Sequence, residues 1–102
     1  MKIITEKRAQ QELIQIKWYI QQDSEFYANK TIYEINKRIK NLLLFPEMGK
    51  VINEKQNIRQ IIYKSYKILY RFNSNKIYIL HIIHHSRDIS ILKFWTQIYL
   101  KF

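Results

Sequence analysis

The stretch from Ile58 to Asp88, IRQIIYKSYKILYRFNSNKIYILHIIHHSRD, contains three apolar runs separated by two short polar breaks. The breaks are Lys64-Ser65 and Asn73-Ser74-Asn75. Isoleucine, tyrosine and phenylalanine at this density favour strands over helices. We therefore predict an antiparallel meander, with strands over about residues 58–63, 66–72 and 76–85.

Alternation along these strands predicts two different sheet faces, because successive strand side chains point in opposite directions. If 73–75 is a three-residue loop, Phe72 pairs with Lys76, Tyr70 with Tyr78, Ile68 with Leu80 and Tyr66 with Ile82. That face is mainly apolar. The other face pairs Arg71 with Ile77, Leu69 with Ile79 and Lys67 with His81, and continues through Ile83 and His85 towards Arg87. A two-residue loop would shift the register and break this sorting.

The residues before the meander predict a short strand followed by two helices. Residues 2–4 are a candidate strand, and Thr5 is the expected N-cap of a helix over about residues 6–22. Asp23-Ser24 is a break and a good cap for a second helix over about residues 25–44, packed antiparallel on the first. The expected buried stripes are Ala9, Leu13, Ile16 and Ile20, with Ile14 and Trp18 on a neighbouring stripe, and Ala28, Ile32, Ile35, Ile39 and Leu42.

Pro46 is expected to end the second helix, and Gly49 to permit a turn with positive φ. A polar stretch, residues 50–57, then leads into the meander. Residues 89–102, ISILKFWTQIYLKF, form either a third helix closing over the sheet or a partner-dependent tail.

The prediction is one α+β domain over residues 1–102, ordered β-α-α-β-β-β(-α). Its helical hairpin covers one face of a small twisted antiparallel sheet.

Charge is the most informative property of the whole chain, whose formal net charge is +10. Residues 1–54 hold nine Lys/Arg against seven Asp/Glu, whereas residues 55–102 hold nine against Asp88 alone. Such a field attracts nucleic acid or an acidic protein, although a lysine-rich solvated surface is the simpler alternative.

The absence of cysteine excludes disulfides and thiolate metal sites. No apolar run is long enough for a membrane span, so we expect a cytoplasmic protein.

Five side chains on the open sheet face are candidates for metal-free RNA cleavage, which needs a base, cations and an acid. These are Lys67, Arg71, His81, His85 and Arg87. The alternative is that they bind phosphate or acidic protein without chemistry. His81 and His85 would lie roughly 13 Å apart along a strand, which is too far for one metal ion. No cofactor motif is present.

The other singled-out residues have structural or mixed interpretations. His84 is expected in the core by strand parity, with Tyr66 and Tyr70 as core aromatics. Arg59 either pairs with an acid in a half-buried position or contacts a target.

The chain resembles the RelE/ParE superfamily of bacterial type II toxins over about residues 3–89. No single motif carries this resemblance; the ordered set does, in a basic chain of this length. The set is Ala9 with Leu13, Ile16 with Tyr19-Ile20, Leu42, FPEMG at 45–49, Arg59, YKILYR at 66–71 and HHSRD at 84–88.

The resemblance implies a toxin that a cognate antitoxin neutralises in a hetero-oligomer. The FPEMG string and the HHSRD ending look closer to the ParE branch, whose members poison DNA gyrase and are not known as nucleases. RelE-like members cleave mRNA on the ribosome. Their arginine after the meander tyrosine is Lys67 here, and their C-terminal tyrosine would fall near Lys93. A ribosome-dependent mRNA endonuclease and a non-toxic nucleic-acid-binding domain remain the alternatives.

Overall fold

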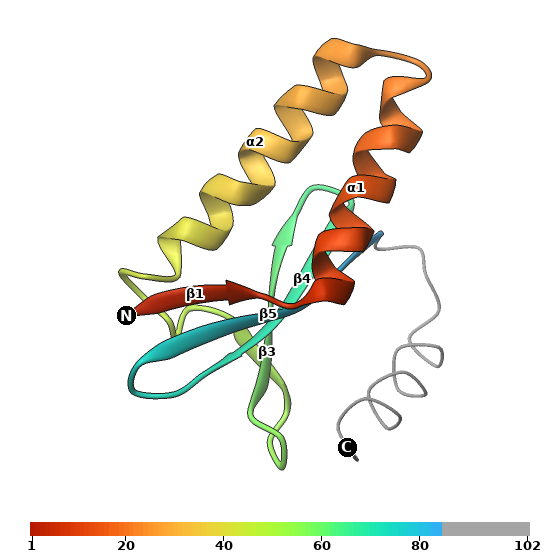
Figure 1. The fold of residues 1–102 in the computed structure, drawn as a ribbon. Helices are drawn as coiled ribbons and strands as arrows, with labels where there is room; N and C mark the ends of the chain where they lie inside the picture. Colours follow the sequence, from red (N-terminus) through yellow and green to blue (C-terminus); the bar gives the residue numbers. More distant parts are fainter. Residues whose placement is uncertain (85–102) are drawn as a thin grey trace.

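The computed structural model describes residues 1–84 as two helices packed on a five-stranded sheet. The elements, in chain order, are β1 (Lys2–Thr5), α1 (Lys7–Gln21), α2 (Glu25–Asn41), β2 (Lys50–Asn53), β3 (Ile58–Tyr63), β4 (Tyr66–Phe72) and β5 (Lys76–His84). Figure 1 shows the helical hairpin rising from the sheet, with its tip extending beyond it. The predicted α+β fold is therefore confirmed. The predictions for residues 85–102 lie outside the described residues.

The two helices begin and end close to the predicted positions, but their N-caps differ in kind. The Ser24 hydroxyl accepts a hydrogen bond from the Tyr27 N–H at 3.2 Å, as expected of a capping serine. The predicted cap Thr5 is instead the last residue of β1, and Glu6 occupies the N-cap of α1 without a side-chain bond. Helix α2 ends at Asn41 rather than near residue 44, because Leu42–Leu44 continue as tighter turns.

The sheet has the order β1-β5-β4-β3-β2 and is mixed rather than purely antiparallel. β1 pairs with β5 in parallel, and the helical hairpin and strands β2 to β4 lie between these two strands in the sequence. The meander strands β3, β4 and β5 pair antiparallel, as predicted. β2 pairs with β3 inside the stretch that was expected to be a polar connection. The sequence did not predict this edge strand, because two of its four residues, Lys50 and Asn53, are polar.

The predicted register between β4 and β5 is wrong at the turn. Phe72 pairs with Ile77, not Lys76, because the Asn73 N–H donates to the Lys76 carbonyl at 2.9 Å and leaves Ser74-Asn75 as a two-residue turn. The Asn73 carboxamide oxygen accepts the N–H groups of Asn75 and Lys76, both at 2.9 Å, and thereby stabilises this tight turn.

A β-bulge then corrects the parity further along β5. Tyr70 pairs with Ile79 and Leu69 with His81, so Leu80 is the extra residue. As a result Ile77, Ile79 and Ile82 all pack in the core under the helices. Ile77 and Ile79 are two residues apart, whereas Ile79 and Ile82 are three residues apart because of the bulge. Leu80 points to the opposite face, where the prediction had placed Ile77 and Ile79.

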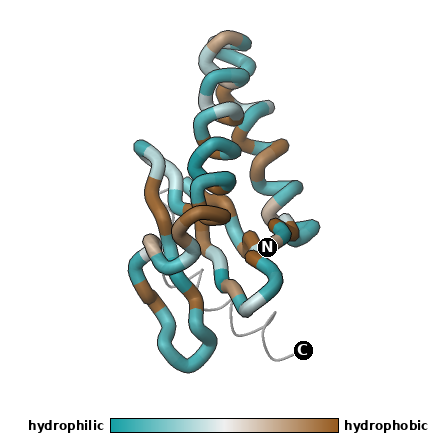
Figure 2. Tube along the Cα trace, turned by 90° about the vertical axis from the view of Figure 1, so that its left-hand side faces the viewer, coloured by the Kyte–Doolittle hydropathy of each residue, from teal (hydrophilic) through white to brown (hydrophobic). Residues whose placement is uncertain are grey.

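The main core lies between the helical hairpin and the sheet, and the apolar segments that form it are visible in Figure 2. Four residues of the predicted α2 stripe are buried, and Ile32 is half-buried. Ala9 of α1 is fully buried, whereas Leu13, Ile16 and Ile20 are half-buried. Ile14 and Trp18, on the neighbouring α1 stripe, are instead exposed. A smaller buried cluster of Ile58, Leu69 and Ile83 lies on the other face of the sheet. No helix within residues 1–84 is long and apolar enough to cross a membrane.

Candidate functional site

The sheet face opposite the helices, which we call the open face, carries Lys67 and Arg71. Both lie on β4 in phase with Leu69, which belongs to the smaller apolar cluster. Lys67 is only 9% exposed, and no described carboxylate lies within ion-pair distance of it. The Arg71 guanidinium lies 5.9 Å from the ring centre of Tyr78, its cross-strand neighbour. The structure therefore brings these two predicted cations together on one face.

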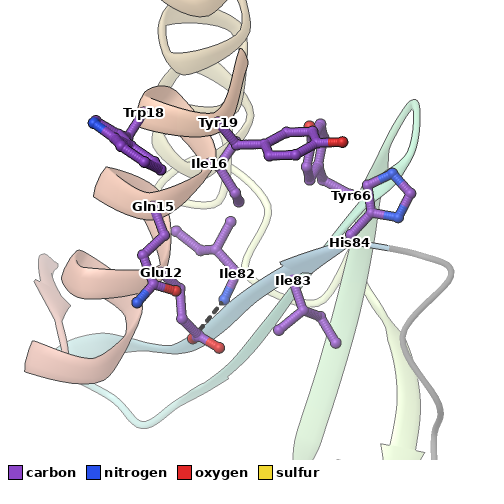
Figure 3. A pocket seen from close by; sticks show the side chains of 9 residues that line it. All are labelled: Glu12, Gln15, Ile16, Trp18, Tyr19, Tyr66, Ile82, Ile83 and His84. Atoms are coloured by element: carbon purple, nitrogen blue, oxygen red, sulfur yellow. Dashed lines mark hydrogen bonds between the residues drawn. The ribbon is translucent and has the colours of Figure 1, made fainter. Parts of the chain in front are cut away.

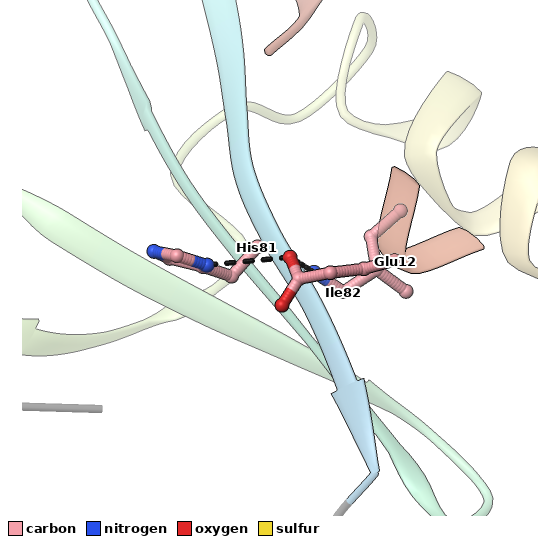
Figure 4. Close-up of polar contacts among 3 residues, drawn as sticks. All are labelled: Glu12, His81 and Ile82. Atoms are coloured by element: carbon pink, nitrogen blue, oxygen red, sulfur yellow. Dashed lines mark hydrogen bonds and ion pairs between the residues drawn. The ribbon is translucent and has the colours of Figure 1, made fainter. Parts of the chain in front are cut away.

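His81 belongs to the same face by its pairing with Leu69, but its ring is held by Glu12 of α1 (Figure 4). His81 Nδ1 lies 3.3 Å from Glu12 Oε1, and the same oxygen accepts the Ile82 N–H at 3.2 Å. Both side chains are about nine-tenths buried. His81 is thus tied to the edge of the sheet and does not pair across the strands with Lys67.

The Glu12 side chain provides a hydrogen-bond acceptor for the distal half of β5, where β1 no longer pairs with that strand. The pairing with β1 ends at Ile79, whose carbonyl accepts the N–H of Glu6. Beyond that point the Ile82 N–H would face water at an unpaired sheet edge. The Glu12 carboxylate satisfies this donor, so α1 stabilises the strand segment that leads to residues 84–88.

A pocket of about 430 Å³ opens between α1 and the ends of β4 and β5 (Figure 3). The ring of Tyr19 reaches towards Tyr66, whereas Trp18 projects from the rim. Tyr66 meets the imidazole of His84 edge-on, with ring centres 5.3 Å apart. Burial, and then the neighbouring Tyr19, raise the pKa of Tyr66 above its ordinary value. The lining residues are Glu12, Gln15, Ile16, Trp18, Tyr19, Tyr66, Ile82, Ile83 and His84.

The turn at residues 45–49 is anchored by Tyr70 from the core. The Tyr70 hydroxyl donates to the Pro46 carbonyl at 2.7 Å and accepts the Gly49 N–H at 2.9 Å. Gly49 has no positive φ, so the predicted reason for glycine is wrong. Glycine is needed here because there is no room for a side chain. An added Cβ would lie 2.5 Å from Tyr70 Oη and 2.9 Å from the Gln60 carbonyl oxygen.

Arg59 contacts the same turn, in a way that neither of its two predicted roles described. Its Nη1 donates to the carbonyls of Glu47 and Gly49, both at 2.9 Å. Its guanidinium also lies 5.6 Å from the ring centre of Phe72. Arg59 therefore holds the 45–49 turn through backbone carbonyls, rather than pairing with an acid. We place it among the structural residues with Pro46, Gly49 and Tyr70.

The remaining predicted site residues are distributed over different parts of the molecule. His84 is exposed at the pocket and is not a core residue, although it lies edge-on to Tyr66. Tyr66 is half-buried. His85 and Arg87 lie outside the described residues. Within residues 1–84, no group of three or more potential metal ligands comes together.

The sequence reasoning missed Glu12, Trp18 and Tyr19. Glu12 had a usable signal, because it lies between Ala9 and Ile16 on the buried side of α1, where an acid needs a partner. Trp18 was assigned to packing from its helical spacing, and its exposure depends on how far the hairpin extends beyond the sheet.

Comparisons with known proteins agree with this architecture. A search of curated protein sequences gives no significant match. A solved chain described as "Chromosomal ParDE TA system from P. aeruginosa" has the same fold, with a TM-score of 0.70 and 20% identity. The alignment covers 82% of this chain and 95% of that chain. The family described as "ParE toxin of type II toxin-antitoxin system, parDE" matches residues 3–89. This chain therefore belongs to the ParE toxin family of type II toxin–antitoxin systems.

Proposed function

We propose that this protein inhibits bacterial growth by binding DNA gyrase, without catalysing a reaction, and that a cognate antitoxin neutralises it. Membership of the ParE family carries the proposal. Target binding is assigned to the open face, with Lys67 and Arg71 described there and His85 and Arg87 following β5.

Lys67 is the described residue that supports a binding role most directly. The Lys67 side chain is largely buried, and no described carboxylate pairs with its ammonium. An acidic group of a partner would supply that pair when it docks. The apolar neighbours Leu69 and Ile83 would add hydrophobic contact.

The positions of the histidines support binding over RNA cleavage. His81 is engaged by Glu12, and His84 points to the helix-side pocket, so neither converges on Lys67. A general base has to reach its proton within hydrogen-bonding distance. The ribosome-dependent nuclease is therefore the competing hypothesis in the test.

The test measures DNA supercoiling by purified gyrase with and without the purified protein. We expect supercoiling to stop, and we expect expression of the chain alone to arrest bacterial growth. Co-expression of the antitoxin should restore growth. Arrest with unimpaired supercoiling and codon-periodic mRNA cuts would reject the gyrase proposal in favour of the nuclease. Absence of arrest would reject both toxin mechanisms and favour a non-toxic nucleic-acid-binding domain.

A further inference from the structure

The pocket between α1 and the ends of β4 and β5 differs in charge from the rest of this basic chain. The sequence holds 18 Lys/Arg against 8 Asp/Glu, yet none of the described residues that line the pocket is a lysine or an arginine. Among those lining residues, with His84 neutral, Glu12 carries the one formal charge. A cavity with a carboxylate and no basic side chain attracts a cation and repels a phosphate or a carboxylate.

The position of the pocket along α1 also favours a cation. Trp18 and Tyr19 lie in the last turn of the helix, where the backbone carbonyls give the helix end a partial negative charge. A basic side chain in this turn would compensate that charge, and α1 has none there. The helix end therefore adds to the field of Glu12.

The Glu12 carboxylate has an oxygen that can accept a further hydrogen bond. Its contacts with His81 Nδ1 and with the Ile82 N–H both use Oε1, at 3.3 and 3.2 Å. Within residues 1–84, Oε2 is the oxygen left to accept from a ligand. The Glu12 side chain is only 11% exposed, so a charged donor on Oε2 would be shielded from water. A primary ammonium fits one oxygen because it is a compact charge with three donors.

Aromatic rings form the other end of the pocket. Figure 3 shows Glu12 at one end and Tyr19, Tyr66 and His84 at the other. Tyr66 and His84 already meet edge-on, with ring centres 5.3 Å apart, and the ring of Tyr19 reaches towards Tyr66. A further aromatic ring could stack on these rings or meet them edge-on. The volume of about 430 Å³ is typical of a site for a small molecule.

We propose that this pocket binds a small arylalkyl amine in its protonated form. The ammonium donates to Glu12 Oε2, and the aromatic ring packs beside Tyr19 and Tyr66. The two ends of the pocket thus recognise the two ends of the ligand. Neither Lys67 nor Arg71 lines the pocket, so the inference stands whether or not gyrase is the target.

The probes are phenethylamine, the neutral phenethyl alcohol and the anion phenylacetate, each titrated against the full chain at neutral pH, where the amine is protonated. Amide chemical shifts give both the affinity and the location of binding. We expect the amine to shift the residues that line the pocket and to bind about tenfold more tightly than the alcohol. Phenylacetate should not bind there, because Glu12 repels it.

The variant E12Q separates charge from shape, because glutamine keeps an oxygen acceptor for the Ile82 N–H. Its affinity for the amine should fall about tenfold, and its affinity for the alcohol should not change. The matched control is E54Q, which removes the same charge at an exposed position outside the pocket. E54Q should bind the amine like the native chain.

A second pair of variants tests the aromatic end without changing any charge. Tyr19 is 73% exposed and Tyr27, which does not line the pocket, is 59% exposed, so neither Y19A nor Y27A removes a core side chain. Y19A should weaken binding of both the amine and the alcohol, whereas Y27A should weaken neither. Circular dichroism should show every variant folded.

Four results would overturn the proposal. The first is equal affinity of the native chain for the amine and the alcohol, which would show a merely apolar cavity. The second is equal weakening by E12Q and E54Q, because only net charge would then matter. The third is amide shifts confined to residues outside the pocket. The fourth is equal binding of the amine by Y19A and Y27A, which applies even if E12Q does not fold.

Discussion

At the scale of single residues, Tyr70 joins the core to the turn that follows α2. Its ring is fully buried, and its hydroxyl bonds to the backbone at both Pro46 and Gly49. Tyr70→Phe leaves the Pro46 carbonyl and the Gly49 N–H without this hydrogen-bond partner. We expect a loss of about 1–3 kcal/mol in the free energy of unfolding, measured by urea denaturation. Tyr33→Phe, at an exposed position, should change it by less than about 0.5 kcal/mol.

The same hydroxyl predicts a change of stability at alkaline pH. Burial raises the pKa of Tyr70 above 10.0, against smaller lowering effects of the Gly49 hydrogen bond and Arg59. The folded state therefore holds this proton more tightly than the unfolded state. The resulting stability is present below pH 10 and is lost as the pH rises through the pKa of the folded protein. The free energy of unfolding of Tyr70→Phe should fall less steeply above that pH. An unchanged slope would contradict the assignment.

At the scale of structural elements, the 45–49 turn depends on close approach rather than on unusual backbone angles. In Gly49→Ala the new methyl group would lie 2.5 Å from the hydroxyl oxygen of the buried Tyr70, 2.7 Å from a carbon of its ring and 2.9 Å from the Gln60 carbonyl oxygen of β3. We expect a loss of about 1–3 kcal/mol. Adding Tyr70→Phe should relieve only part of this loss, so a double-mutant cycle should give a non-zero coupling. Additive effects would show that the two residues do not meet.

The distal half of β5 pairs with β4 on one side, and on the other side its Ile82 N–H donates to the Glu12 carboxylate. Glu12→Ala leaves the Ile82 N–H without its acceptor, so its hydrogen exchange should become about tenfold faster by nuclear magnetic resonance. Glu12→Gln keeps an oxygen acceptor and should preserve protection. Gln11→Ala, one residue earlier on an exposed face, is the control. Equal exchange in Glu12→Ala and the native chain would exclude the proposed role.

At the scale of the whole molecule, the strong positive charge does not explain binding by itself, because most lysines are solvated. Lys67→Met keeps the aliphatic length of a largely buried side chain and removes its charge. We expect it to retain the fold and to raise the concentration needed for gyrase inhibition about tenfold. Lys55→Met removes an exposed charge and should leave inhibition unchanged. Equal inhibition by Lys67→Met and the native chain would show that the open face is not the gyrase-binding site.

The amino-acid sequence by itself determined the elements of this protein within residues 1–84, except for β2. Apolar residues at helical spacing specify α1 and α2, and Ser24 marks the break between them, because these signals act over one or two turns. The meander strands follow equally from dense β-branched and aromatic runs. The basic second half and the ordered motifs, taken together, pointed to the correct toxin family.

Only the tertiary structure decided how those elements meet. The register of β5 depends on the Asn73 side chain and on a bulge at Leu80, and each shifts side chains between faces by a single residue. The roles of Glu12 and Arg59 depend on partners that are 70 and 12 residues away in sequence. Local patterns do not encode such contacts, because they form only when the hairpin, the sheet and the 45–49 turn pack against one another.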